Sequence, residues 1–154
     1  MKKVLLVLLA VVLLGGAAQA QVFKLSLWGD ICVPNEDYIG GLELAIGTET
    51  PAVDGVQLAF IYAQADKMRG LQSALVSSTK DGQGVQWSFV NLADQFQGAQ
   101  FGFVNWSKDV KGLQWGFINY TETMKGIQLG LVNIIKNNTY NTLSFCTICT
   151  ISFN

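Results

Sequence analysis

A short phrase recurs along most of this chain at an almost fixed spacing, and no other feature restricts its possible folds as strongly. The phrase is Gly-apolar-Gln followed by alternating small and apolar residues. Its Gln occurs six times, separated by one step of 15 residues and then four of 14: Gln57, Gln72, Gln86, Gln100, Gln114 and Gln128. A degraded seventh copy precedes these, with Gly41 lying 14 residues before Gly55 and with Glu43 in the place of Gln. A fixed period predicts an array of one structural unit.

The N-terminal segment, residues 1–20, has the pattern of a secretory signal peptide. Two lysines precede an apolar run from Val4 to Leu14, and small residues lead up to a cleavage position after Ala20. The apolar run is shorter than the roughly 20 residues that a membrane-spanning helix needs. We therefore expect this segment to be removed on export.

The remaining chain, residues 21–154, has the length of one domain. We expect a single repeat-built β domain in which the repeats cover about 41–134 and a closing strand covers about 142–153. Without the two N-terminal lysines, 8 basic residues stand against 11 acidic ones, so the net charge is −3. Such a chain has no basic face with which to neutralise phosphates, and we expect no nucleic acid partner.

Three cysteines remain after the cleavage position, Cys32, Cys146 and Cys149. An odd number leaves at least one thiol outside any intramolecular disulfide, so the chain is not a disulfide scaffold, and the sequence does not fix the redox state of the three. Cys146 and Cys149 have the spacing of a redox motif, but that chemistry needs a helix N-terminus. On a strand, residues three apart point to opposite faces, so we interpret both as small structural residues.

Each copy divides into a nine-residue segment, which starts at the repeat Gly, and a linker of about five residues. The six segments contain no charged residue, whereas the linkers between them are rich in charge. The segments are too short for ordinary helices and rich in β-branched and aromatic residues, so we predict strands. With the repeat Gly as position 1, one face collects bulky residues at positions 2, 4 and 6, such as Trp87 and Phe89, and the other collects Gly, Gln and small residues.

Three all-β architectures fit this pattern. Our preferred prediction is an antiparallel meander that closes as a small membrane-type β-barrel of about 8–10 strands, with the bulky face toward lipid and Gln or Glu43 in the lumen. The alternative is a β-solenoid with one 14-residue repeat per rung, in which the Gln and Asn side chains form ladders. Its difficulty is finding room for a Trp and a Phe inside one rung. A sandwich, the third architecture, would expose a face of Gly, Gln and Val to water.

The phrase Gly-x-Gln-x-Gly-x-x-Asn resembles the 14-residue surface repeats of exported bacterial envelope proteins. It is complete in three copies: Gly98–Asn105, Gly112–Asn119 and Gly126–Asn133. The resemblance covers roughly residues 41–134, and the first two full copies depart from it, with Tyr62 and Ser77 at the Asn position. The ending Ile151–Asn154 is similar to the aromatic-terminated last strand of outer-membrane barrels, although its aromatic residue is penultimate. The resemblance implies a surface or outer-membrane location and no known reaction.

Residues that could carry chemistry are few. The chain has no His, which excludes His-based acid–base catalysis and His-ligated zinc. Its repeat aromatics could form a carbohydrate or nucleobase platform, but their fixed positions in the period favour packing against a core or lipid: Trp87, Phe101, Trp106, Trp115 and Tyr120. We therefore predict no enzyme activity and no catalytic, cofactor-binding or metal-binding residue.

The predicted function follows from export and architecture. We expect a protein of the bacterial cell envelope, in the outer membrane or at the cell surface, with a structural or surface-interaction role and the lipid bilayer as its partner. The alternative function is a small pore or ligand-binding β-barrel. The sequence identifies no protein or small-molecule partner.

Overall fold

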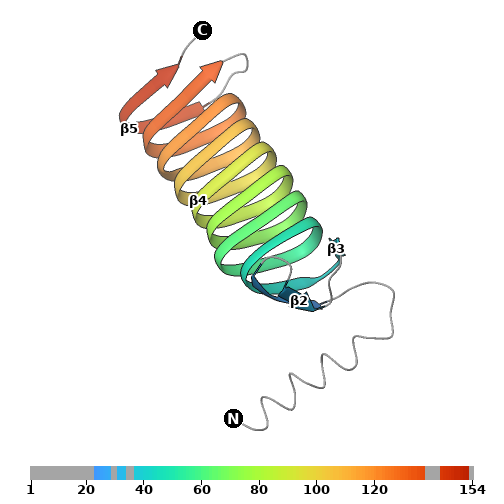
Figure 1. Cartoon of the computed structure of the whole chain (residues 1–154). Coiled ribbons are helices and arrows are strands. Elements are labelled where there is room, and N and C mark those ends of the chain that lie inside the picture. Colours follow the sequence, from blue (N-terminus) through green and yellow to red (C-terminus); the bar gives the residue numbers. More distant parts are fainter. Residues whose placement is uncertain (1–22, 29–30, 34–36, 138–142, 153–154) are drawn as a thin grey trace.

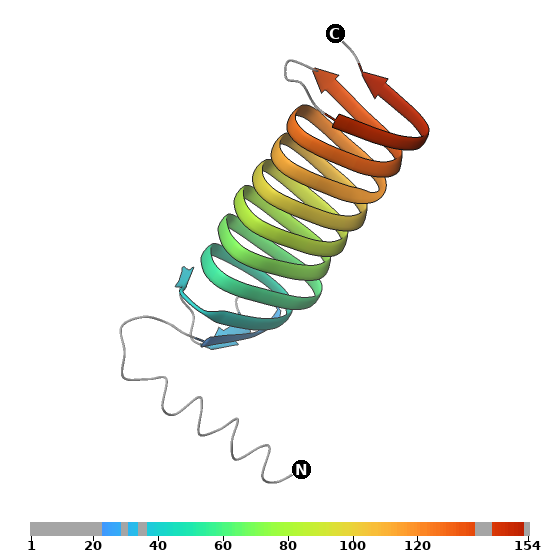
Figure 2. The same cartoon turned by 180° about the vertical axis from the view of Figure 1, so that it is seen from behind.

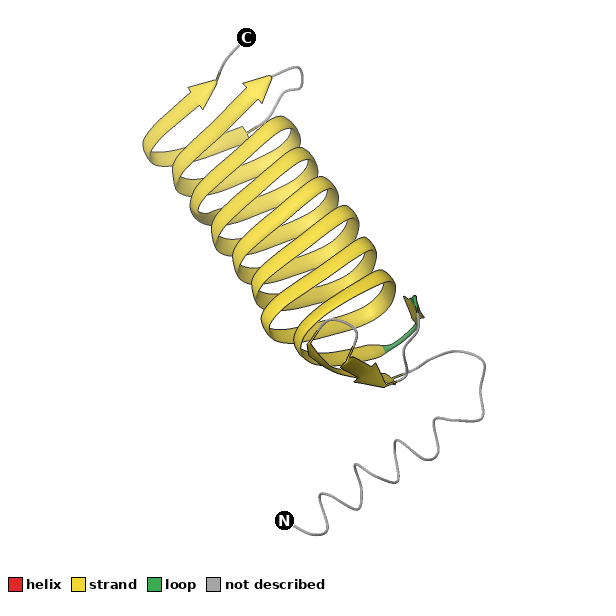
Figure 3. Ribbon diagram, viewed as in Figure 1, coloured by secondary structure: helices red, strands yellow, loops and turns green. Residues whose placement is uncertain are grey.

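The computed structural model describes residues 23–28, 31–33, 37–137 and 143–152. Its elements are all strands: β1 (Phe23–Trp28), β2 (Ile31–Val33), β3 (Tyr38–Ile39), β4 (Leu42–Asn137) and β5 (Leu143–Ser152). They belong to one sheet, in which β4 pairs with β1, β3 and β5. The all-β fold class is therefore confirmed (Figure 3). No helix within the described ranges is long and apolar enough to cross a membrane. The signal peptide predicted for residues 1–20 lies outside these ranges.

Strand β4 runs without a break through 96 residues, so the linkers predicted as separate turns belong to the strand itself. In Figures 1 and 2 its ribbon winds as a coil in which each loop lies against the one before it. One 14-residue repeat makes one loop, here called a rung, because hydrogen bonds join residues 14 apart. The Ser73 hydroxyl, for example, donates to the carbonyl oxygen of Trp87 at 2.8 Å.

The described pairing of β4 is parallel, and the predicted antiparallel meander is wrong. Strands β1, β3 and β5 each run parallel to the part of β4 that they contact, whereas the short β1–β2 pair is antiparallel. The last strand, predicted at about 142–153 to close a barrel, pairs instead with residues 127–135 of β4. The reason is that the five-residue linkers stay extended and carry the chain around the coil instead of reversing its direction. Each repeat position therefore lies beside the same position of the next repeat.

The repeat Gly at position 1 allows the rungs to approach each other at one corner of the coil. Gly112 has φ of 139°, in the region that residues with a Cβ rarely adopt. A Cβ built on it would lie 2.0 Å from the carbonyl oxygen of Gly98 in the preceding rung. Both observations require glycine, which explains why this residue opens every repeat.

The inside of the coil combines polar ladders with smaller apolar clusters. The repeat Gln side chains and those of Asn91, Asn105, Asn119 and Asn133 are fully buried. Linker residues form one apolar cluster from Ala93, Phe96, Val110 and Met124 and another from Val53, Ala65 and Met68. The bulky residues of the nine-residue segments lie on the outside instead. The predicted separation of a Gln face from a bulky face is therefore confirmed.

Candidate interaction groove

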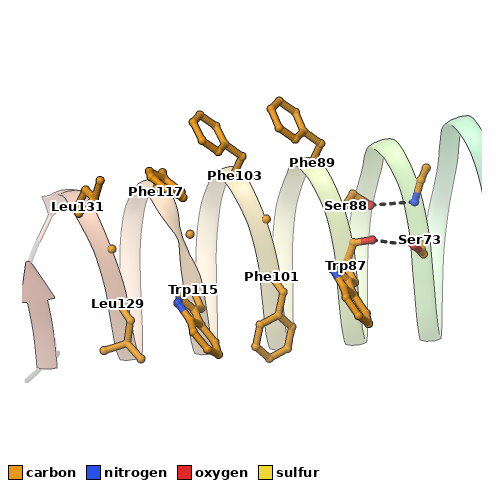
Figure 4. Close-up of a pocket in the computed structure, with 14 residues that line it drawn as sticks. Ser73, Trp87, Ser88, Phe89, Phe101, Phe103, Trp115, Phe117, Leu129 and Leu131 are labelled. Atoms are coloured by element: carbon orange, nitrogen blue, oxygen red, sulfur yellow. Dashed lines mark hydrogen bonds between the residues drawn. The ribbon is translucent and has the colours of Figure 1, made fainter.

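An apolar groove lies on the outside of the coil. It encloses about 900 Å³ and is lined by positions 4, 5 and 6 of successive repeats, from Ser73 to Leu131. Because neighbouring strands lie about 4.8 Å apart, the five rungs that line it give a length of about 20 Å. Figure 4 shows its two walls diverging from the same strand segments. The groove therefore follows the axis of the coil.

The two walls of the groove are rows of large apolar side chains. The position-4 wall comprises Trp87, Phe101, Trp115 and Leu129, and the position-6 wall comprises Phe89, Phe103, Phe117 and Leu131. On the second wall, the Phe103 ring stacks on Phe89 with a centroid distance of 5.0 Å and on Phe117 at 4.5 Å. On the first, Phe101 meets Trp115 edge to face at 5.9 Å. Ring pairs at these separations stabilise one another, so the position-6 wall is a continuous stack of three rings and the position-4 wall contains one ring pair.

The floor of the groove is narrow because position 5 points inward and carries only small residues: Ala74, Ser88, Gly102, Gly116 and Gly130. A Cβ on Gly116 would lie 2.4 Å from the carbonyl oxygen of Gly102 and 2.7 Å from the amide nitrogen of Asn105. The small residue at position 5 therefore makes room for the Asn ladder directly beneath the groove.

The Asn ladder under the floor holds the groove backbone in place. Asn105 Nδ2 donates to Asn119 Oδ1 at 2.7 Å and to the carbonyl oxygen of Trp115 at 3.1 Å. Asn91 and Asn119 make the equivalent pairs of bonds. Each buried amide thus ties one rung to the next and fixes the backbone that carries a wall residue.

A second ladder, made by the repeat Gln residues, runs along the inside of the coil. Each Gln Nε2 donates to the Gln Oε1 of the preceding rung at 2.7 to 2.9 Å, from Gln128 back to Gln57. The Asn amides donate in the opposite direction, toward the C-terminus. From the rung of Asn91 onward, the interior therefore holds amide hydrogen bonds of both directions.

Glu43 ends the Gln ladder at its N-terminal side. Its Oε2 accepts from Gln57 Nε2 at 2.9 Å, and its Oε1 accepts from Thr48 at 2.5 Å and Thr50 at 2.8 Å. Lys24 on β1 lies 3.6 Å from the same carboxylate, and both side chains are buried. A carboxylate is an acceptor only, so it suits the rung where every neighbouring group donates. This explains the Glu in the Gln position of the degraded copy.

A row of alternating charge runs along one linker position, and sequence reasoning missed it. The row alternates acid and base from rung to rung: Asp66, Lys80, Asp94, Lys108, Glu122 and Lys136. Three ion pairs join its members, at 2.7, 2.7 and 3.6 Å. The hydrogen bond to Asp94 raises the pKa of Lys108 above its usual value, and that to Asp66 raises the pKa of Lys80. The alternation was visible in the sequence at the same period as the Gln.

The aromatics that the sequence singled out do not form one platform. Trp87, Phe101 and Trp115 lie on the groove wall, whereas Trp106 and Tyr120 belong to a separate row and pack on each other at 4.4 Å. Trp87, Trp106 and Trp115 lie on the outer face of the coil and not in a core, because all three are more than half exposed.

The remaining candidate residues stay apart from the groove. The backbone of Cys146 and Cys149 lies in β5, beside Gly130 and Val132, and Cys32 lies in β2 at the other end of the coil. Within the described residues, no three Cys, Asp or Glu side chains come together as a metal site. Three of the linker carboxylates, those of Asp66, Asp94 and Glu122, form ion pairs on the surface. The prediction that the chain has no catalytic residue stays a prediction.

No protein-family model, no curated protein and no solved structure matches this chain.

Proposed function

We propose that this chain is an exported bacterial envelope protein with a structural or surface-interaction role, built as a β-solenoid with one 14-residue repeat per rung. The single observation that carries the proposal is the division of every repeat between a hydrogen-bonded interior and an apolar exterior. Gln100 and Asn105 are fully buried, while Phe103 of the same repeat is 39% exposed. The interior maintains the coil, and the exterior is available for contact.

The interior also argues against a conducting or ligand-holding lumen. The six repeat Gln side chains are fully buried and bonded to one another along the coil. A pore would need these amides to line water. The alternative function of a small pore is therefore not proposed.

Export and envelope location rest on the pattern of residues 1–20 and on the repeat phrase. The test is to express the full chain in a bacterium with an outer membrane and to separate cytoplasmic, periplasmic and membrane fractions. The matched control is Leu8→Arg, which interrupts the apolar run. We expect the normal chain to begin at Gln21 by intact mass and to leave the cytoplasm, and we expect the control to retain Met1. A normal chain that stays in the cytoplasm with Met1 would contradict the proposal.

The solenoid part of the proposal has its own test. Since each rung contacts its neighbours in sequence, deleting residues 98–111 removes one complete rung and preserves every other contact of the ladders. The control deletes residues 98–104, which shifts every later Gln out of the ladder. We expect the first deletion to resist protease and the second to be degraded. Equal sensitivity of the two variants would contradict one repeat per rung.

A further inference from the structure

The groove exposes more apolar surface than the fold of a single copy requires. Its two walls continue toward the N-terminus through Leu58, Phe60 and Leu75, which are 36%, 75% and 52% exposed. The charged row of the linkers contributes no residue to it. Exposed apolar surfaces larger than a few hundred square ångströms mark interaction sites.

The two serine hydroxyls at the groove are already engaged. The Ser73 hydroxyl donates to the carbonyl oxygen of Trp87 at 2.8 Å, and Ser88 Oγ accepts from the backbone N–H of Ala74 at 3.0 Å and pairs with Ser77 Oγ at 2.5 Å. A carbohydrate would need free donors and acceptors beside the rings to fix its hydroxyl groups. The groove therefore fits an apolar occupant.

The exposed area of the walls is that of one side of a stable protein interface. A Phe or Trp side chain presents about 150–250 Å². Five wall aromatics are 39% to 68% exposed, and together they offer roughly 550 Å² by that measure: Trp87, Phe89, Phe103, Trp115 and Phe117. The exposed Leu58, Phe60 and Leu75 extend this to about 800 Å², the area that each partner of a standard interface buries.

We propose that this groove is a homodimer interface, occupied by the same groove of a second copy of the chain. In this dimer the two copies are related by a two-fold axis at the groove. The wall of Phe89, Phe103 and Phe117 in each copy lies in the groove of the other copy. The two copies have the same rung spacing of about 4.8 Å. Each wall ring of one copy therefore meets the same groove position of the other copy on every rung, a match that a partner without this period does not provide.

A lipid bilayer, the partner expected from the sequence, is the other apolar surface that the groove could meet. Proteins that lie on anionic membranes place Lys and Arg beside the apolar face. Here the linker row nearest in period to the Gln ladder alternates in charge, with Lys108 between Asp94 and Glu122, and no Lys or Arg lines the groove itself. The observations favour the second copy, and the bilayer becomes an outcome of the test.

The experiment measures the mass of the mature chain in solution by light scattering and sedimentation over a concentration series. Phe103→Lys places a charge on the central wall, and the matched control Trp106→Lys places one on an aromatic that is 53% exposed but lies outside the groove. Losing one central interface aromatic weakens binding about 30-fold, and the two-fold axis applies this factor twice, once for each copy. We therefore expect a dimer whose Kd rises about a thousandfold in Phe103→Lys and little in Trp106→Lys.

Circular dichroism of each variant checks that the fold persists. If Phe103→Lys does not fold, Trp115→Ser on the opposite wall replaces it and must weaken the dimer. A chain that is monomeric at all concentrations overturns the proposal, and flotation of that monomer with phosphatidylcholine–phosphatidylglycerol vesicles would assign the groove to lipid. A dimer that Phe103→Lys and Trp106→Lys weaken equally also overturns it.

Discussion

Replacing Gln100 with Leu should destabilise the protein more than any other apolar substitution of similar volume in the same repeat. Gln100 is fully buried, its Nε2 donates to Gln86 at 2.7 Å, and its Oε1 accepts from Gln114 and from Ser107 at 2.9 Å each. Leu is close in volume to Gln, so the cavity is small and the loss comes from hydrogen bonding.

The magnitude follows from the three groups that lose a partner. Each buried donor or acceptor left unsatisfied costs about 1 to 3 kcal/mol. The Gln86 oxygen, the Gln114 amide and the Ser107 hydroxyl lose their partner together, so we expect a loss of about 3 to 9 kcal/mol. That is a large share of the about 5–15 kcal/mol that stabilises a typical domain.

Urea unfolding followed by circular dichroism measures the difference. The matched control is Gln97→Leu, the same exchange three residues earlier on an exposed side chain. An exposed substitution of this kind changes stability by about 0.5 kcal/mol or less. We expect the unfolding midpoint of Gln100→Leu to fall well below that of Gln97→Leu. Equal midpoints would refute the assignment of Gln100 to a buried ladder.

Three further substitutions test other parts of the coil. Gly112→Ala should cost more than about 3 kcal/mol or prevent folding, because of its positive φ and the 2.0 Å approach of a Cβ to the neighbouring carbonyl; protease resistance measures this. Glu43→Gln should cost about 3 to 5 kcal/mol in urea unfolding, since it leaves the buried charge of Lys24 without an opposite charge, and adding Lys24→Met should recover part of the loss. Lys108→Glu places three acids on successive rungs, so the melting temperature should fall at low salt and largely recover at high salt. No recovery in either of the last two experiments would contradict the corresponding contact.

The alternation of side chains was predictable because it depends only on the two-residue period of a strand. Gln86 inside and Trp87 outside follow from adjacent positions, and the structure has them so. The amide ladders expected of the solenoid alternative are also found for Gln and Asn. Both features can be predicted from the period of the strand and the period of the repeat, because neither depends on the direction in which neighbouring strands run.

The direction of pairing was not predictable from those periods. In an antiparallel meander, position 3 meets position 7, and in a parallel stack it meets its own copy, so bulky residues stay together in both. The objection that a rung lacks room for Trp115 and Phe117 fails because both point outward and are at least half exposed. The sequence did contain a deciding feature. Asp94 and Lys108 lie in successive linkers, which a meander would place at opposite ends of a strand and a parallel stack places side by side.

The central claim is that residues 14 apart lie side by side on successive rungs. Its most direct test replaces Asp94 and Lys108 with cysteine in a chain whose native cysteines are serine, and follows disulfide formation by intact mass under mild oxidation. Neighbouring strands lie about 4.8 Å apart, within the range that a disulfide spans. The comparison pair, Asp94→Cys with Glu122→Cys, lies two rungs apart, at about 10 Å, beyond that range. The account predicts rapid, intramolecular closure of the first pair and not of the second, whereas absence of closure in the first pair, or faster closure in the second, would contradict it.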